Sequence, residues 1–119
     1  ELHRQHIDQL ASQVVRQIEQ SYADSDLSPT RIADSLGMSS AYLGRIFRES
    51  MQTSISQYLN QTRIRRAEEL LRETEQPVET VAGLVGFSNP KYFYVVFKNI
   101  TGQTPLQFRK EVHSASEKN

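Results

Sequence analysis

One pattern occurs twice in this chain of 119 residues: a short segment with an apolar face, a glycine turn, and a longer segment that opens on a helix-capping residue. The first copy begins at residue 28 and the second at residue 77. The offset between them is 49 residues up to the turn and 50 residues beyond it, so the second turn is one residue longer. The matched residues are Ala33, Leu36, Gly37 and Ser39 with Ala82, Val85, Gly86 and Ser88, and then Tyr42, Leu43, Phe47 and Tyr58 with Tyr92, Phe93, Phe97 and Phe108. Because glycine, cap and aromatic positions agree together, we interpret the pattern as an internal repeat.

Apolar residues recur at helical spacing along almost the whole chain. The stripes in residues 3–22 and 54–73 predict two long amphipathic helices. A capping residue directly before proline, at residues 28–29 and 89–90, is typical of a helix start. Glycines mark helix ends, at Gly37, Gly86 and Gly102. The alternation typical of strands is absent, so we predict an all-α fold with seven helices.

The repeated unit predicts a helix-turn-helix, in which a short helix packs across a second helix that keeps one face free. The second helix of such a unit can enter the major groove of DNA with its N-terminal residues towards the base edges. If the units are held about 34 Å apart, one chain can occupy successive turns of the groove. The expected order is a lead-in amphipathic helix at 1–27, a first helix-turn-helix at 28–53, a linker helix at 54–76, a second helix-turn-helix with a closing helix at 77–112, and a frayed tail at 113–119.

The stretch "GFSNPKYFYVVFKNITGQTP", residues 86–105, is too apolar for an ordinary surface helix. The spacing assigns most of its apolar residues to a buried face, namely Phe87, Phe93, Val96, Phe97 and Ile100. Tyr94 and Val95 are not explained by that face. We expect these two side chains to be exposed, in or beside the major groove, or packed on a neighbouring domain.

Net charge is zero, from 14 basic and 14 acidic residues, but the charges are unevenly placed. Residues 1–28 carry two basic residues against five acidic ones, whereas residues 29–73 carry seven basic against five acidic residues and residues 74–119 carry five basic against four acidic residues. There is no cysteine, which excludes a disulfide framework, a thiolate metal site and a cysteine nucleophile. No run of apolar residues is long enough for a membrane span, and the start "ELHRQHIDQL" has no signal-peptide pattern. A cytoplasmic location is therefore expected, and the opening on Glu1 suggests a piece of a longer protein.

Two stretches carry a resemblance to a known family. They are "IADSLGMSSAYLGRIFRESMQTSISQYLNQTRIRRAEELL" and "VAGLVGFSNPKYFYVVFKNITGQTPLQFRKE", the second of which has GF, YF, FK and TGxTPxxFR in register. Residues 28–112 resemble the DNA-binding domain of AraC-type transcription regulators. The resemblance implies sequence-specific binding of double-stranded DNA, a preceding sensor or receiver domain, and RNA polymerase as a further partner. The chain departs from the family pattern at Gln52, where a glycine is usual, and at Tyr94 and Val95, where polar residues or arginine are common.

The outward positions of the two expected recognition helices are the candidate base-reading residues. Arg45 is the strongest, because its planar fork can donate two bonds to guanine O6 and N7; the alternative is a solvated surface arginine. Lys91 can reach a guanine or a phosphate, and Tyr94 and Val95 can contact thymine methyl groups. Gly44 can let the backbone approach the groove, at a cost of about 1 kcal/mol relative to alanine in mid-helix. The remaining candidates are Ser40, Ala41 and Pro90.

Phosphate contacts fix the position of a protein on DNA rather than read its sequence. Basic side chains that fit this role are Arg31, Arg48, Lys98, Arg109 and Lys110. Residues at helix starts can add hydroxyl and backbone N–H donors, namely Ser39, Ser54, Ser88, Asn89 and Thr104.

Signs of other chemistry are weak. His3 and His6 lie one helical turn apart without a third ligand, so we expect a solvated pair and no metal. There is no nucleophile motif, glycine-rich phosphate loop or paired acid and base, so we expect neither an enzyme nor a cofactor. The alternative function is a helical protein-interaction module that contacts RNA polymerase or a sensor domain. The dependence of binding on salt distinguishes DNA binding from protein interaction, since binding through several phosphates weakens steeply with ionic strength.

Overall fold

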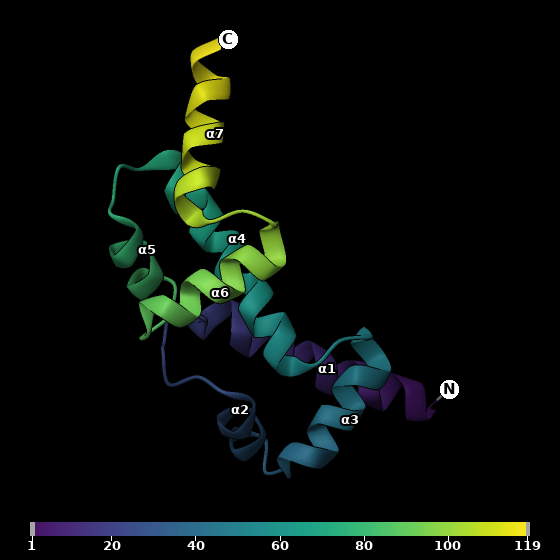
Figure 1. Cartoon of the computed structure of the whole chain (residues 1–119). Helices are drawn as coiled ribbons and strands as arrows, with labels where there is room; N and C mark the ends of the chain where they lie inside the picture. The colour runs from purple at the N-terminus through teal and green to yellow at the C-terminus, as the bar shows by residue number, and fades with distance from the viewer. Residues whose placement is uncertain (1, 119) are drawn as a thin grey trace. The chain divides into compact units, whose positions relative to one another are not determined.

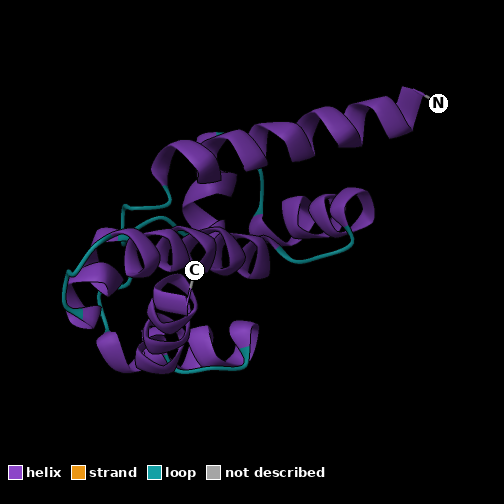
Figure 2. Ribbon diagram, turned by 90° about the horizontal axis from the view of Figure 1, so that it is seen from above, coloured by secondary structure: helices purple, strands orange, loops and turns teal. Residues whose placement is uncertain are grey.

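The computed structural model describes residues 2–118, and the surroundings of side chains are described as far as residue 115. This part of the chain is all-α with no strand, as predicted (Figure 2). Figure 1 shows the order of the helices. They are α1 (Leu2–Ser21), α2 (Pro29–Ser35), α3 (Ser40–Met51), α4 (Ile55–Glu73), α5 (Val78–Leu84), α6 (Pro90–Thr101) and α7 (Pro105–Lys118).

The chain divides into two compact units, Glu1–Thr62 and Arg63–Asn119. We call them unit 1 and unit 2. The division falls inside α4, so the expected linker helix supplies residues to both units: Leu59 is buried in the core of unit 1, and Leu71 is buried among the residues of unit 2.

Unit 1 is built around α3, against which α1 and α2 both pack. Two apolar clusters hold these helices together. The larger one has Ile18 of α1, Ile32 of α2 and Phe47 of α3 at its centre, each with no measurable exposure. In the smaller one Ile7 and Leu10 of α1 contact Ile46 of α3. The lead-in helix is therefore an integral layer of unit 1, which buries one face of α3 and leaves the other open.

Unit 2 has an aromatic core. Phe93 and Phe97 of α6 are fully buried, with ring centroids 5.6 Å apart. Phe87, in the turn before α6, lies 5.2 Å from Phe93, and Phe108 of α7 lies 5.7 Å from Phe97. Tilted and edge-to-face rings at these distances are favourable beyond their buried area. The core assignment of Phe87, Phe93, Val96 and Phe97 is confirmed.

The repeat inferred from the sequence is present as repeated geometry. The ring of Phe47 meets Tyr58 edge-on at 5.8 Å and 81°, and the matched pair Phe97 and Phe108 meets at 5.7 Å and 76°. Each turn is closed by the same backbone bond: Met38 N donates to Ala33 O at 2.9 Å, and Phe87 N donates to Ala82 O at 2.9 Å. The repeated turn bonds and ring pairs show that the two units share one local architecture.

Side chains cap most of the helix starts that the sequence indicated. Ser28, Ser39 and Asn89 accept hydrogen bonds from backbone N–H groups in the first turns of α2, α3 and α6. Ser54 does the same for α4, accepting from Gln57 N at 3.0 Å. At α7 the bond is reciprocal, since Thr104 Oγ1 accepts from Gln107 N while Gln107 Oε1 accepts from Thr104 N.

Two expectations about α6 were wrong. Ile100 was expected in the core, but 42% of its surface is exposed. The matched residue in unit 1, Ser50, is half-buried because α1 lies beside it and Asp8 accepts its hydroxyl proton. Helical spacing defines a stripe, but it does not say how far along that stripe a neighbouring helix reaches. Tyr94 was expected to be exposed, but it is half-buried with its ring edge-on to Phe93, 6.2 Å away.

Candidate nucleic-acid interface

The open face of α3 carries small and basic side chains. Ala41, Arg45 and Arg48 are all exposed, whereas Leu43 and Phe47 are buried on the opposite face. Gly44 is half-buried at the boundary between the two faces, and a Cβ built there would have no atom within 4 Å. The start of this helix is fixed by Ser39, whose hydroxyl accepts from Tyr42 N at 3.2 Å.

Ser40 is exposed, but its hydroxyl is engaged within the protein. Its Oγ donates to Thr30 Oγ1 at 3.4 Å, a long bond that joins the start of α3 to α2. With its proton used in this bond, Ser40 keeps its lone pairs to accept a hydrogen bond, so its expected base-reading role is that of an acceptor.

The open face of α6 carries the matched positions with a different chemistry. Pro90, Lys91 and Lys98 are exposed, and Val95 exposes 56% of its surface. Val95 stands where unit 1 has Arg45, so the central outward position changes from a forked cation to an apolar side chain. Asn89 fixes the start of the helix, with its Oδ1 accepting from Lys91 N at 2.9 Å.

Two exposed tyrosines lie on these faces and were not among the predicted outward positions. Tyr42 of α3 exposes 42% of its surface and Tyr92 of α6 exposes 50%. They occupy matched positions of the repeat, three residues before Arg45 and Val95, and such residues lie next to each other on a helix surface. That spacing was the signal that could have placed them on the outward face.

The helix-start residues keep donors available for a phosphate. The hydroxyls of Ser39, Ser54 and Thr104 accept hydrogen bonds from their own helices, which uses a lone pair and leaves the hydroxyl proton free to donate. Asn89 uses its carbonyl oxygen in the same way, which leaves its NH₂ group to donate. Ser88 and Arg31 are exposed.

Arg109 has a task inside unit 2. Its Nε donates to Leu71 O at 3.1 Å and its Nη2 donates to Thr74 O at 3.2 Å. These carbonyls belong to the last turn of α4 and the residue after it, where a helix runs out of backbone partners. The guanidinium is thereby fixed on the end of α4, which favours a structural role for Arg109, and its phosphate contact stays a prediction.

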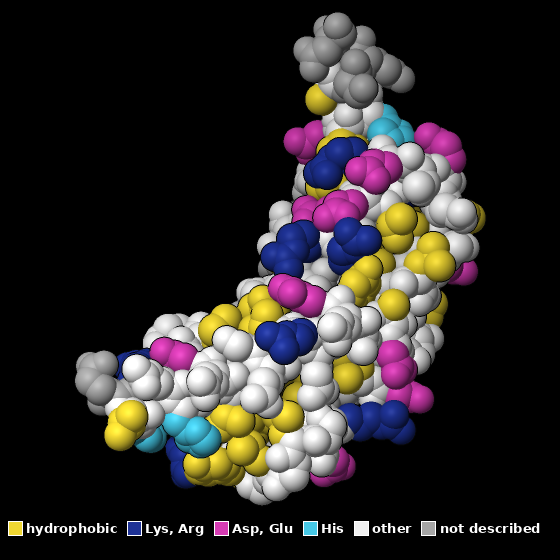
Figure 3. Space-filling view, turned by 180° about the vertical axis from the view of Figure 1, so that it is seen from behind, with side chains coloured by type: hydrophobic (Ala, Val, Ile, Leu, Met, Phe, Trp, Pro, Cys, Tyr) yellow, Lys and Arg dark blue, Asp and Glu magenta, His cyan; other side chains and the backbone are white. Residues whose placement is uncertain are grey.

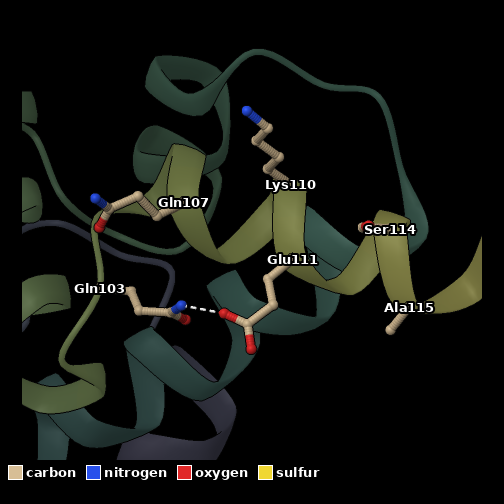
Figure 4. A pocket seen from close by; sticks show the side chains of 6 residues that line it. All are labelled: Gln103, Gln107, Lys110, Glu111, Ser114 and Ala115. Atoms are coloured by element: carbon tan, nitrogen blue, oxygen red, sulfur yellow. Dashed lines mark hydrogen bonds between the residues drawn. The ribbon is translucent and has the colours of Figure 1, made fainter.

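Lys110 borders a shallow hollow along α7 (Figure 4). Its ammonium group points away from the neighbouring Glu111, whose carboxylate accepts from the amide of Gln103. The acidic side chain is therefore turned towards the loop before α7 and away from the ammonium group of Lys110.

The described surface is mixed in charge rather than uniformly basic. On the face drawn in Figure 3, Lys and Arg side chains are interspersed with Asp and Glu. Over residues 2–118, no group of three or more potential ligands could hold a metal ion, and no helix has the length and apolar character to cross a membrane. His3 lies 3.7 Å from Glu49 rather than beside a ligand cluster.

Comparison with known proteins identifies the family. A family model described as a helix-turn-helix domain matches residues 32–111. The Msm operon regulatory protein of Streptococcus mutans is 37% identical over 100 residues, which cover 84% of this chain and 36% of that protein. A solved transcriptional regulator of Chromobacterium violaceum, described as containing an AraC-type DNA-binding domain, is 27% identical with a TM-score of 0.75, covering 87% of this chain and 91% of that one. The chain belongs to the AraC family of transcription regulators.

The AraC-family match includes both helix-turn-helix units, and the family is one of DNA-binding regulators rather than enzymes. The fold agrees closely with the C-terminal domain of AraT, a response regulator from Geobacillus stearothermophilus, with a TM-score of 0.83, 30% identity, and coverage of 86% of this chain and 84% of that one. The chain spans about a third of the length of the Msm and arabinose operon regulatory proteins, and 15% of a longer regulator of Staphylococcus aureus.

Proposed function

We propose that this domain binds double-stranded DNA sequence-specifically, with α3 and α6 as recognition helices that enter successive turns of the major groove. The supporting observation is that the same face is left open on both helices at an offset of 50 residues. Arg45 and Arg48 are exposed on α3, as Val95 and Lys98 are on α6, while the matched Phe47 and Phe97 are buried. A repeat that served packing alone would not have to leave the same face free twice.

The exposed side chains divide into base-reading and phosphate-binding groups. Arg45 reads a guanine, Lys91 a guanine or an adjacent phosphate, and Val95 the methyl group of a thymine, with Tyr94 at the edge of that contact. Ala41, Gly44 and Pro90 allow close approach, and Ser40 accepts a hydrogen bond from a base while it donates to Thr30. The phosphate contacts are made by Arg31, Arg48, Lys98 and Lys110, and by donors at the helix starts, namely Ser39, Ser54, Ser88, Asn89 and Thr104.

The protein that contains this domain should have a further domain and further partners. We infer a preceding sensor or receiver domain, because the C-terminal domain of AraT, which this fold resembles, belongs to a response regulator. A regulator of this kind acts on DNA in the bacterial cytoplasm and passes its signal to RNA polymerase. The alternative function is a module that binds only RNA polymerase or a sensor domain, and the membership of the chain in a family of DNA-binding regulators argues against it.

Selection of bound sequences from random duplex DNA, repeated at two salt concentrations, tests the proposal. We expect one asymmetric consensus, and an affinity that falls steeply with salt because several phosphates release counterions. Binding with no sequence preference, or an affinity that salt leaves unchanged, would favour the protein-interaction module.

A further inference from the structure

Tyr42 and Arg45 form a pair on the open face of α3. The Arg45 Cζ lies 5.5 Å from the centroid of the Tyr42 ring, within the range of a cation–π interaction. The two residues are three positions apart on one helix, which places their side chains side by side. Both are exposed, so the pair faces the direction from which DNA approaches in the proposed function.

The backbone of Tyr42 is fixed at the start of the helix. Its N–H donates to the capping hydroxyl of Ser39 at 3.2 Å, which holds the residue in the first turn of α3. Among the side chains that the structure describes, no carboxylate forms an ion pair with Arg45. The tyrosine ring is thus the contact that restrains a guanidinium which is otherwise solvated.

The second unit uses the matched tyrosine differently. Tyr92 packs against Phe87 with ring centroids 5.9 Å apart, and the residue three positions further on is Val95. In unit 1 the position that matches Phe87 is Met38, which offers no ring. The residue three positions after the repeated tyrosine is therefore a cation in unit 1 and an apolar side chain in unit 2.

We propose that Tyr42 is a positioning residue for base reading, because its ring holds the Arg45 guanidinium in the orientation that meets guanine. This inference rests on the proposed function of Arg45. A side chain restrained before binding loses less rotamer freedom on contact, and an arginine has much to lose. The ring's contribution is then seen as sequence preference at one base pair, and not as general affinity.

The test measures the dissociation constants of this chain for the selected duplex and for duplexes that change one base pair at a time. The variants are Tyr42→Leu, which keeps apolar bulk without a π face, Tyr42→Phe, which keeps the ring, and Tyr92→Leu as the matched control. We expect Tyr42→Leu to reduce the preference at the Arg45 base pair by about 2- to 5-fold, the range of an exposed cation–π contact. Tyr42→Phe should retain that preference, and Tyr92→Leu should leave it unchanged.

Arg45→Ala separates the inference from the function on which it rests. If Arg45→Ala leaves every base preference intact, Arg45 does not read a base and the proposed function of that residue fails. If Arg45→Ala removes the preference at one base pair, the double variant with Tyr42→Leu should lose no more there. Three outcomes would overturn the positioning role of Tyr42. They are an equal loss of affinity at all base pairs with Tyr42→Leu, a loss of preference from Tyr42→Leu that persists in the Arg45→Ala background, and a loss of preference with Tyr42→Phe. Thermal unfolding of each variant shows whether the fold is intact.

Discussion

Gly44 is a glycine in the middle of a recognition helix, with open space where a side chain would be. Alanine there should raise the free energy of unfolding by about 1 kcal/mol, because it restricts the unfolded chain and favours the helix. If DNA approaches the helix at this point, the same methyl group should weaken DNA binding. We therefore expect Gly44→Ala to be more stable and to bind DNA less tightly, as measured by thermal unfolding and by titration of the selected duplex.

Gly83 supplies the control for Gly44. It lies in α5, and a Cβ there would also have no atom within 4 Å. Gly83→Ala should gain similar stability and keep full DNA affinity. Equal affinities of the two variants would show that Gly44 is only a tolerated weak position.

Gln52 and Gly102 occupy matched C-cap positions with left-handed backbone. Gln52 has φ 62° and Gly102 has φ 83°, and each N–H closes the last turn of its recognition helix. A side chain in this region costs about 1 kcal/mol or more, which glycine avoids. We expect Gln52→Gly to raise the free energy of unfolding by about 0.5 to 1 kcal/mol and Gly102→Gln to lower it by a similar amount. Denaturant unfolding measures both, and a loss of stability in Gln52→Gly would show that the bond from Gln52 Nε2 to Glu49 O outweighs the strain.

At the scale of the helices, Arg109 and Lys98 were assigned the same role from the sequence, and the structure separates them. Arg109→Ala removes two charged donors from the end of α4 and should lower the free energy of unfolding by about 1 to 3 kcal/mol. The DNA affinity of Arg109→Ala should depend on salt in the same way as that of the unsubstituted chain. Lys98→Ala should do the reverse, leaving stability nearly intact and reducing the slope of log affinity against log salt by about 1, as for one phosphate.

Arg109→Met controls for length in that comparison, since it keeps an unbranched side chain without donors. Apart from a difference in side-chain packing, it should lower the free energy of unfolding by as much as Arg109→Ala does. A reduced salt slope with stability unchanged in either Arg109 variant would restore this residue to the phosphate contacts.

The elements that could be predicted are those defined by local chemistry. Capping residues before Pro29 and Pro90, and the glycine turns, depend on a few neighbouring atoms, so their sequence pattern is enough. Tyr94 was missed because its ring lies against its sequence neighbour Phe93, a contact that helical spacing does not show. Ile100 could not be predicted, because its exposure depends on where other parts of the chain end. Arg109 belongs to the same group, since its bonds reach 38 and 35 residues back along the chain. Tyr42 could have been predicted, because its spacing from Arg45 is local.

At the scale of the whole domain, the two units present different side chains at the same position of the repeat. In the proposed function Arg45 of unit 1 contacts a guanine and Val95 of unit 2 contacts a thymine methyl group, so we expect the preferred DNA site to be asymmetric. We expect Arg45→Ala to cost about 1 to 3 kcal/mol of binding free energy at one base pair. Val95→Ala should cost about 1 kcal/mol at a different base pair, from the loss of buried methyl contact. Titration of duplexes with single changes measures both losses.

The double variant of Arg45→Ala and Val95→Ala tests whether both units are bound to DNA at once. If each recognition helix reads its own part of the site, the losses of Arg45→Ala and Val95→Ala should add within about 0.5 kcal/mol, because the substitutions share no partner. If the chain instead binds through one unit at a time, loss of the Arg45 contact would shift binding to unit 2 and the sum would not hold. If Arg45→Ala and Val95→Ala reduce the preference at the same base pair, the assignment of one base-reading residue to each unit is wrong.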